Sequence, residues 1–246
     1  MRRPGVDLVR HPAGARELVL LAHGGEERSH ADPHLWRPAL LRMWPFARAA
    51  RSVAPHVAIG FLRYRFRGWN DDGDAAADLR TVLDELPPVI SRVLLIGHSM
   101  GGRAVVAAGD HPRVAGVLGL APWLPRDEPL VMLRPPVTFV HGIDDTITSP
   151  AGTAAYAQRL RAAGVEVTTY SLAGEGHAML RRAKDWDRLV TEFVQGKPAG
   201  GGDEHWPAVR DQAVRDQAVR GQVVSAVGDI VTARLRMPVK ERFRAE

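Results

Sequence analysis

The sequence of 246 residues contains no cysteine. This absence excludes thiol catalysis, disulfide bonds and zinc sites built on cysteine. Long apolar runs are also missing, because the longest, residues 18–22 and 114–124, are far shorter than the ~20 residues of a membrane span. No apolar core of a secretory signal follows the polar start at Met1. We therefore expect a cytoplasmic protein that does not contact a membrane.

Lysine is almost absent, and this shapes the charge of the chain. Only Lys184, Lys197 and Lys240 are lysines among 33 basic residues, so arginine supplies the rest. Arginine binds phosphate groups well, which raises the question of nucleic acid. The basic residues are, however, scattered among 28 acidic ones, and the net charge is only +5. We interpret the arginine excess as a compositional bias and expect no nucleic-acid partner.

Short apolar runs alternate with longer helical patterns from Glu17 to about Gln195, as in a parallel α/β sheet. Several runs are apolar throughout, which is typical of strands covered by helices on both faces. The expected strands are residues 18–22, 57–64, 92–97, 114–120, 137–141 and 165–172, with a further one at 6–10. The expected helices are residues 38–51, 74–86, 100–109, 150–163 and 180–194. The prediction is an α/β protein with a mostly parallel sheet of about six or seven strands.

A change of composition near residue 196 predicts a domain boundary. The stretch 196–204 is rich in glycine and reads as a linker. A three-fold repeat of five residues follows at 208–222, and then a stretch whose apolar residues share one helical face. We predict a catalytic domain at 1–196 and an extension at 197–246, which is either a docking helix or a dispensable addition produced by a short duplication.

The strongest chemical signal is the segment Gly97-His98-Ser99-Met100-Gly101. It has the pattern G-x-S-x-G between an apolar strand and an alanine-rich helix, which is the nucleophile elbow. The serine stands on a sharp turn where bulky neighbours would clash, and glycines at both ends remove them. The helix that starts after Ser99 directs its amide dipoles at charge developing on a substrate oxygen.

A serine hydroxyl needs a base, and the base needs an orienting group. Asp144 and Asp145 follow the buried strand at 137–141. His177 lies in the loop after the last expected strand, where Gly174 and Gly176 precede it. An acid at the end of the strand at 137–141 would lie at the same edge of the sheet as Ser99. The chain order is thus serine, aspartate, histidine.

With these motifs, residues 16–195 resemble the α/β-hydrolase fold, a family of serine hydrolases, and in particular its small lidless carboxylesterase and dienelactone hydrolase-like members. The resemblance implies that Ser99 is the nucleophile, His177 the general base and Asp145 the group that orients His177. Asp144 is the alternative acid, but the spacing of the H-G-x-x-D motif favours Asp145. No cofactor is implied.

The resemblance also implies an oxyanion hole built from backbone amides. One amide belongs to Met100, the residue after the nucleophile, and the other to Gly25 in the segment His23-Gly24-Gly25. Gly24 would lie beside the substrate. We interpret His23 as a turn residue that bonds to nearby backbone, because its position suggests no role in proton transfer.

Family members often carry a helical lid before the strand that bears the acid. Here only residues 121–136 are available, enough for one short helix at 128–133. We therefore expect an open site. Trp123 lies in this segment, at the edge where open α/β sheets bind ligands, and either lines the acyl pocket or packs in the core.

Other polar residues have weaker functional interpretations. His98 and His141 are expected to pack or to fix loops. The spacing of His30, Asp32 and His34 resembles that of metal ligands, but no second cluster accompanies it, so no metal is predicted. Arg63, Arg65 and Arg67 alternate near the end of a strand, where one could meet an acidic substrate group, although solvated charge is the simpler interpretation.

The sequence therefore predicts an enzyme of the carboxylic-ester hydrolase class that acts on small esters through an acyl-enzyme. One alternative is an acyltransferase or thioesterase with the same triad, since water and another nucleophile compete for one acyl-enzyme. A second is a binding protein that keeps the fold without catalysis. The substrate, its acyl chain length and the oligomeric state do not follow from the sequence.

Overall fold

The computed structural model describes residues 3–33 and 38–196, and all of them lie within one of two compact units, residues 1–208. The predicted linker and extension after residue 196, with the five-residue repeat, lie outside the described residues. The strands are β1 (Gly5–Arg10), β2 (Glu17–Ala22), β3 (Ala58–Arg63), β4 (Arg92–His98), β5 (Val114–Leu120), β6 (Val137–Gly142) and β7 (Val167–Leu172). The helices are α1 (Pro38–Val53), α2 (Asp74–Glu85), α3 (Met100–Ala107), α4 (Pro150–Ala162) and α5 (Ala183–Val194).

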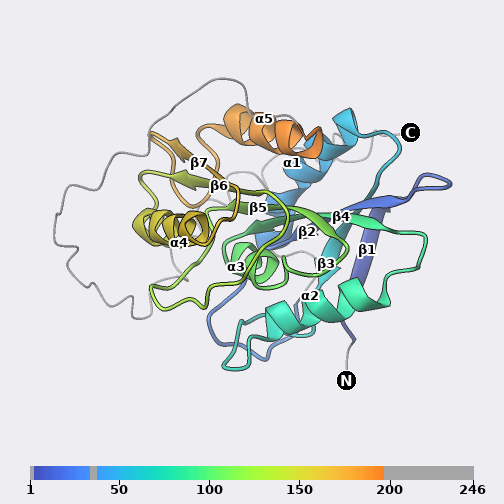
Figure 1. Cartoon of the computed structure of the whole chain (residues 1–246), viewed down its shortest axis with the longest axis horizontal. Helices are drawn as coiled ribbons and strands as arrows, with labels where there is room; N and C mark the ends of the chain where they lie inside the picture. The colour runs from blue at the N-terminus through green and yellow to red at the C-terminus, as the bar shows by residue number, and fades with distance from the viewer. Residues whose placement is uncertain (1–2, 34–37, 197–246) are drawn as a thin grey trace, which may run out of the picture. The chain divides into compact units, whose positions relative to one another are not determined.

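The strands form one seven-stranded sheet with the order β1-β3-β2-β4-β5-β6-β7 (Figure 1). Only β1 runs antiparallel to its neighbour, β3, and every other pairing is parallel. The parallel strands are buried along nearly their whole length in β2, β4 and β5, as their continuous apolar runs predict. The predicted mostly parallel α/β sheet is confirmed.

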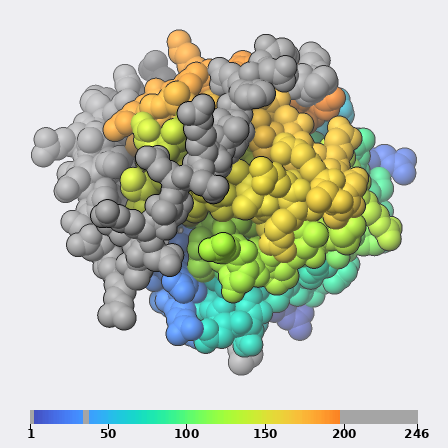
Figure 2. Space-filling view, turned by 60° about the vertical axis from the view of Figure 1, so that its left-hand side comes forward, coloured from blue at the N-terminus to red at the C-terminus, as the bar shows by residue number. Residues whose placement is uncertain are grey.

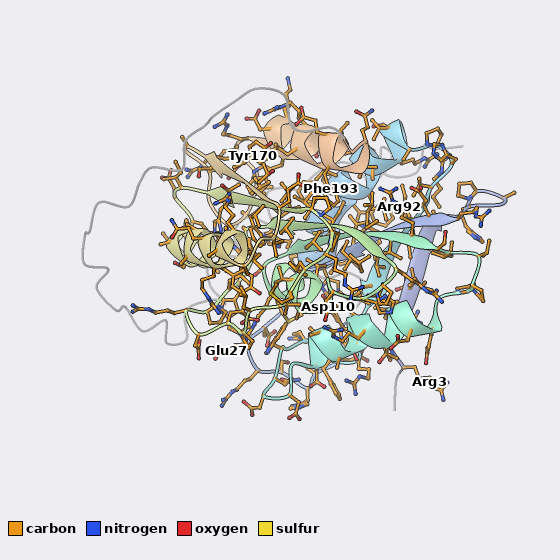
Figure 3. The ribbon with its side chains drawn as sticks, viewed as in Figure 1. Arg3, Glu27, Arg92, Asp110, Tyr170 and Phe193 are labelled. Carbon is orange, nitrogen blue, oxygen red and sulfur yellow. The ribbon has the colours of Figure 1, made fainter. Side chains whose placement is uncertain are left out.

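Two layers of helices cover the sheet (Figure 1). Helices α2, α3 and α4 pack on one face, where Leu79 and Tyr156 belong to one buried cluster with strand residues such as Leu95. Helices α1 and α5 cover the other face, and their Met43 and Trp186 belong to a second cluster. Phe193 of α5 points towards the sheet, and its ring lies against the backbone of β5 at Gly116 (Figure 3).

The register of the parallel strands brings their carboxyl ends to one edge of the sheet. The last residue of β2 pairs with Gly97 of β4, His98 pairs with the last residue of β5, and the last residues of β6 and β7 pair with each other. The segments that follow β2, β4, β5, β6 and β7 therefore meet at this edge. These segments hold every residue that the sequence assigned to the reaction.

Most expected helices form where their local signals lie. For α4, Ser149 accepts a hydrogen bond on its side chain from the Gly152 N–H at 2.9 Å, and Pro150 occupies the first turn. Helix α5 begins at Ala183, three residues later than expected. The Arg182 N–H just before it donates instead to the carboxylate of Glu175 at 2.7 Å, so a loop residue takes the place of a helical partner.

The expected short helix at 128–133 is wrong, because this segment is irregular. Several of its backbone groups bond to side chains of α4 rather than to helical partners. The Tyr156 hydroxyl accepts from the Val131 N–H at 3.2 Å and donates to the Pro129 carbonyl at 3.0 Å, and Arg159 donates to the Glu128 carbonyl at 2.9 Å. In the space-filling view the yellow surface of α4 adjoins green surface from preceding parts of the chain (Figure 2).

Candidate active site

Ser99 occupies the turn between β4 and α3 with a left-handed backbone, φ 57° and ψ −119°. A residue other than glycine in such a conformation is strained by about 1–3 kcal/mol and needs support from its surroundings. The support comes from three backbone hydrogen bonds. The Ser99 N–H donates to the Leu120 carbonyl at 3.1 Å, and the Ser99 carbonyl accepts from the N–H groups of Trp123 at 3.0 Å and Arg103 at 3.1 Å.

The glycines of the elbow are required by close packing. A Cβ added at Gly97 would lie 2.2 Å from the carbonyl oxygen of Gly101, and one added at Gly101 would lie 2.1 Å from the carbonyl oxygen of Ala22. Real Cβ atoms do not approach backbone so closely, so any side chain would push α3 away from β2. The G-x-S-x-G pattern is thus explained by the fit between the elbow and the neighbouring strand.

Asp145 lies in the loop after β6, and its buried carboxylate has a complete set of donors. Oδ1 accepts from the N–H groups of Ile147 at 2.8 Å and Thr148 at 3.0 Å. Oδ2 lies 2.8 Å from His177 Nδ1, 3.0 Å from His141 Nε2 and 2.8 Å from the Thr148 hydroxyl. Burial alone would raise the pKa of Asp145, but these donors, His141 and His177 foremost, outweigh it and hold the pKa below its ordinary value.

His177 bridges the acid and the serine. Its Nδ1 lies 2.8 Å from Asp145 Oδ2, and its Nε2 lies 3.0 Å from Ser99 Oγ. A carboxylate only accepts hydrogen bonds, so Nδ1 carries the proton and the Nε2 lone pair faces the serine hydroxyl. The structure thus brings together Ser99, Asp145 and His177. Asp144, the alternative acid, is exposed and makes no hydrogen bond to His177.

Glu175 anchors the loop that carries His177, and sequence reasoning missed it. The side chain is 1% exposed and accepts from the Gly176 N–H at 2.9 Å, the Arg182 N–H at 2.7 Å and Trp186 Nε1 at 3.1 Å. Its carbonyl accepts from the Asp144 N–H at 3.0 Å, which ties the base loop to the acid loop. An acid between two glycines reads as solvent-exposed, and nothing in the local pattern signals its burial.

The segment after β2 lies against the elbow. A Cβ added at Gly24 would lie 3.3 Å from Ser99 Cβ, and one added at Gly25 would lie 2.5 Å from Met100 Cε. His23 Nδ1 bonds to the Gly24 carbonyl at 2.7 Å, so the predicted turn role of His23 is confirmed. Because the peptide is trans, this bond directs the Gly25 N–H away from His23.

His23 is also kept uncharged in this turn. Burial lowers its pKa, and the bond to the Gly24 carbonyl opposes that shift only in part. A neutral ring that donates through Nδ1 holds the peptide in one orientation. This peptide orientation concerns the Gly25 amide, which the sequence assigned to the oxyanion hole together with the Met100 amide. The segments that hold the two amides are in contact.

A second polar cluster lies beside the elbow, and the sequence analysis did not identify it. The Arg103 guanidinium of α3 stacks on the rings of Trp69 and Trp123, at 3.9 and 4.6 Å from their centres, and its Nε lies 2.6 Å from Glu128. Burial lowers the pKa of Arg103 and raises that of Glu128, and their attraction offsets these shifts only partly. Trp123, which was expected either to line the acyl pocket or to pack in the core, is thus half-buried in this stack.

The three alternating arginines each pair with a carboxylate. Their partners are Asp7 for Arg63, Asp74 and Asp78 for Arg65, and Glu26 for Arg67. All three guanidinium groups are thus already paired with protein carboxylates, which leaves none of them unpaired for a substrate carboxylate. The structure therefore favours a structural role for these arginines over a role in binding an acidic substrate group.

The described residues contain neither a cluster suited to a metal ion nor a helix suited to crossing a membrane. No group of three or more histidine and acidic side chains is placed to hold a metal ion there, and of the candidate ligands His34 lies outside the described residues. Within the same part of the chain, no helix has the length and apolar character that crossing a membrane requires.

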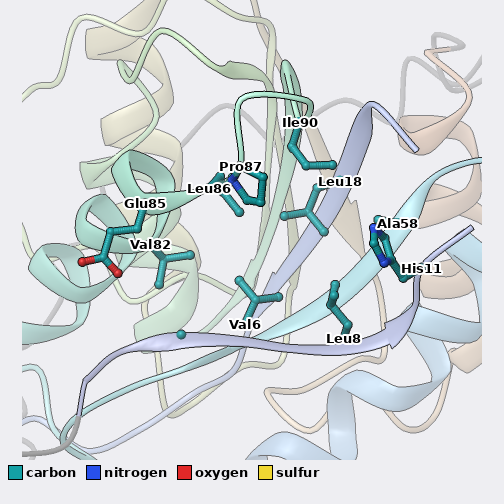
Figure 4. A pocket seen from close by; sticks show the side chains of 11 residues that line it. Val6, Leu8, His11, Leu18, Ala58, Val82, Glu85, Leu86, Pro87 and Ile90 are labelled. Atoms are coloured by element: carbon teal, nitrogen blue, oxygen red, sulfur yellow. The ribbon is translucent and has the colours of Figure 1, made fainter. Parts of the chain in front are cut away.

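An apolar pocket of about 280 Å³ lies between β1, α2 and the neighbouring strands (Figure 4). It is partly open to solvent and is lined by β1, the end of α2 and the first residues of β2 and β3, with Val6, Leu18, Ala58 and Val82 in its wall. Leu18 and Ala58 stand at the amino ends of their strands, whereas Ser99 follows a carboxyl end. This pocket therefore belongs to the opposite edge of the sheet and includes none of the candidate catalytic side chains.

Comparison with known proteins places the fold. The sequence matches no protein-family model, and no curated protein matches it significantly. Solved structures do match. Est1E from Butyrivibrio proteoclasticus, solved with ferulic acid bound, is 13% identical, with 79% of this chain and 94% of that chain covered at a TM-score of 0.57.

Two other solved structures give the same picture. An alpha-beta serine hydrolase homologue from Coxiella burnetii is 16% identical, with 76% and 95% of the two chains covered and a TM-score of 0.58. Esterase PE8 is 17% identical, with 80% and 100% covered and a TM-score of 0.58. The chain thus has the α/β-hydrolase fold, as its motifs predicted.

Proposed function

We propose that this protein is a serine hydrolase that cleaves carboxylic esters of small substrates, with Ser99 as nucleophile, His177 as base and Asp145 as the orienting acid. The observation that carries the proposal is the continuous chain of hydrogen-bonding contacts from Ser99 Oγ through the two ring nitrogens of His177 to Asp145 Oδ2, at 3.0 and 2.8 Å. The fold shared with solved hydrolases and esterases supports it.

The reaction begins with proton transfer. His177 Nε2 takes the proton of the Ser99 hydroxyl as Oγ attacks the ester carbonyl carbon. The resulting imidazolium is stabilised by Asp145, whose low pKa keeps it ionised. The backbone N–H groups of Gly25 and Met100 donate hydrogen bonds to the negatively charged substrate oxygen. Each such donor typically lowers the activation free energy by about 3 kcal/mol.

The acyl-enzyme then forms and breaks down. His177 returns its proton to the leaving alcohol, and the carbonyl carbon stays bonded to Ser99 Oγ. A water molecule gives a proton to His177 and attacks the acyl carbon. When the second tetrahedral intermediate collapses, the bond to Ser99 Oγ breaks, His177 returns the proton to Oγ, and the acid is released. Trp123 and Gly24 are assigned to the walls of the substrate site.

The test is removal of the nucleophile. Ser99→Ala is expected to abolish both hydrolysis of p-nitrophenyl acetate and covalent labelling by a fluorophosphonate, because the proposed acyl-enzyme forms on Ser99 Oγ. Ser91→Ala is the matched control, since Ser91 is exposed and precedes β4 at the opposite edge of the sheet. Hydrolysis that persists in Ser99→Ala would refute the proposal.

The same assay defines the substrate and separates the alternatives. A series of esters from acetyl to long-chain acyl groups gives the preferred chain length. Adding an alcohol or amine acceptor tests for acyl transfer, because a transferase forms more acyl product than free acid. Absence of both hydrolysis and labelling in the wild-type protein would favour a binding protein.

A further inference from the structure

His98 lies against the candidate base, His177. It is the last residue of β4, directly before Ser99, and is 2% exposed. Its Nε2 lies 3.1 Å from the carbonyl oxygen of His177, and the two rings are 4.7 Å apart at an angle of 39°. One side chain thus touches both the backbone and the ring of His177.

The chemistry of this contact defines the state of the His98 ring. A carbonyl oxygen only accepts, so His98 Nε2 carries the proton, and in the neutral ring Nδ1 does not. Nδ1 has no hydrogen-bond partner within the described part of the chain, and a Cβ at Gly24 would lie 3.4 Å from it. Burial, then the charge of His177, lower the pKa of His98 well below its ordinary value, so the ring stays neutral.

The backbone of His177 depends on this donor. Its carbonyl accepts no other hydrogen bond from the described residues, and the loop around it contains Gly174 in the left-handed region, φ 74°. Glu175 holds the start of this loop and Asp145 holds Nδ1 of the ring. Thr148 Oγ1 and Ser99 Oγ also contact the two ring nitrogens, at 3.1 and 3.0 Å, and His98 adds the contact to the backbone carbonyl and to the face of the ring.

We infer that His98 is a positioning residue, which holds the backbone and ring of His177 so that Nε2 faces Ser99 Oγ. The inference rests on the proposed function of Ser99 and His177, and it adds a role to a residue of the elbow that exchanges no proton with the substrate. Gly24 lies beside Nδ1 of the His98 ring, whereas Nε2 of that ring contacts the His177 carbonyl. His98 therefore connects the elbow, the loop that carries His177 and the segment after β2.

The test compares His98→Leu, which has no donor, with His98→Gln, whose amide N–H lies about as far from the backbone as Nε2. His98→Leu is expected to lower kcat about 10- to 100-fold with KM within twofold, since small misplacements of reacting groups are costly. His98→Gln is expected to restore kcat to within about threefold of wild type, because it renews the bond to the carbonyl.

His111→Leu is the control for loss of a histidine elsewhere. His111 lies after α3 and pairs with Asp84, away from the candidate catalytic residues, and the variant should keep the wild-type kcat. Thermal unfolding of each variant checks that the fold is intact. If His98→Leu does not fold, His98→Asn replaces it, because the shorter amide falls short of the His177 carbonyl.

A second readout is independent of activity. In NMR spectra of protein labelled with ¹⁵N-histidine, the His177 ring should give one sharp set of signals in wild type and His98→Gln, and shifted or broadened signals in His98→Leu. Wild-type signals and wild-type kcat in His98→Leu would overturn the inference, and so would a glutamine variant as slow as the leucine one. Wild-type protein without hydrolysis or labelling would instead refute the proposed function, and the ring signals would still decide whether His98 positions His177.

Discussion

Two buried carboxylates stand near Ser99, and their surroundings shift their pKa values in opposite directions. Asp145 is 7% exposed and has donors on both oxygens, two of them backbone N–H groups, so its pKa falls despite burial. Glu128 is 4% exposed and has Arg103 as its ionic partner, so burial dominates and its pKa rises. For these two carboxylates, the number of hydrogen-bond donors rather than the depth of burial thus decides the direction of the pKa shift.

The largest expected difference between these two carboxylates is in catalysis. Asp145→Asn should lower kcat by about 10³- to 10⁴-fold, because an amide no longer selects the His177 tautomer that accepts from Ser99. Glu128→Gln should lower kcat less than about tenfold, since Glu128 contacts Arg103 and none of the three candidate catalytic side chains. Steady-state kinetics with p-nitrophenyl acetate measure both.

Asp144→Asn is the matched control for this experiment, because Asp144 is the adjacent acid and is exposed. It should retain kcat within about threefold, as substitutions at the surface usually have small effects. Equal losses in the Asp144 and Asp145 variants would contradict the assignment of the acid.

The second difference is in stability. Arg103→Met leaves the Glu128 carboxylate, whose side chain is 5% exposed, without its ionic partner, and this should cost roughly 3 kcal/mol of unfolding free energy. Urea unfolding gives the value. The double variant Arg103→Met with Glu128→Leu should recover most of the loss, because the unpaired carboxylate is then removed as well. A single variant as stable as wild type would show that the pair contributes nothing.

The third and smallest difference concerns the dependence of stability on pH. The pKa of Asp145 is depressed in the folded state, so its stabilisation is present above the ordinary aspartate pKa of about 3.9 and is lost as the pH falls below it. Asp145→Asn should therefore flatten the loss of unfolding free energy between about pH 5 and pH 2.

Glu128 should behave in the opposite sense. Its folded pKa is raised, so the folded state binds a proton before the unfolded state does, and acidification towards the ordinary pKa of about 4.3 adds stability. Glu128→Gln removes this gain and should steepen the loss on acidification. Urea unfolding at a series of pH values measures both slopes, and changes of the same sign in the two variants would contradict the comparison.

The residues that follow strand ends could be predicted from the sequence because each has a local signal. The G-x-S-x-G pattern, the acid after a buried strand and the histidine in a glycine-containing loop are read within a few residues. Parallel strands bring their carboxyl ends to one edge, so the order of elements already placed Ser99, Asp145 and His177 near one another.

The supporting residues had no such signal. Glu128 pairs with Arg103 across 25 positions, and Glu175 bonds to Trp186 on the following helix, although each reads locally as a solvent-exposed acid. The helix expected at 128–133 was wrong for the same reason, since Tyr156 of α4 takes the backbone groups that a helix would use.

The sequence by itself thus determined the alternation of strands and helices, the class of sheet and the three side chains of the candidate triad. Only the tertiary structure decided which carboxylate has a full set of donors, which guanidinium lies between two indoles, and how His98 reaches the backbone of His177. The physical reason is that periodicity and turn chemistry act over a few residues, whereas burial and the satisfaction of polar groups depend on which distant segments meet.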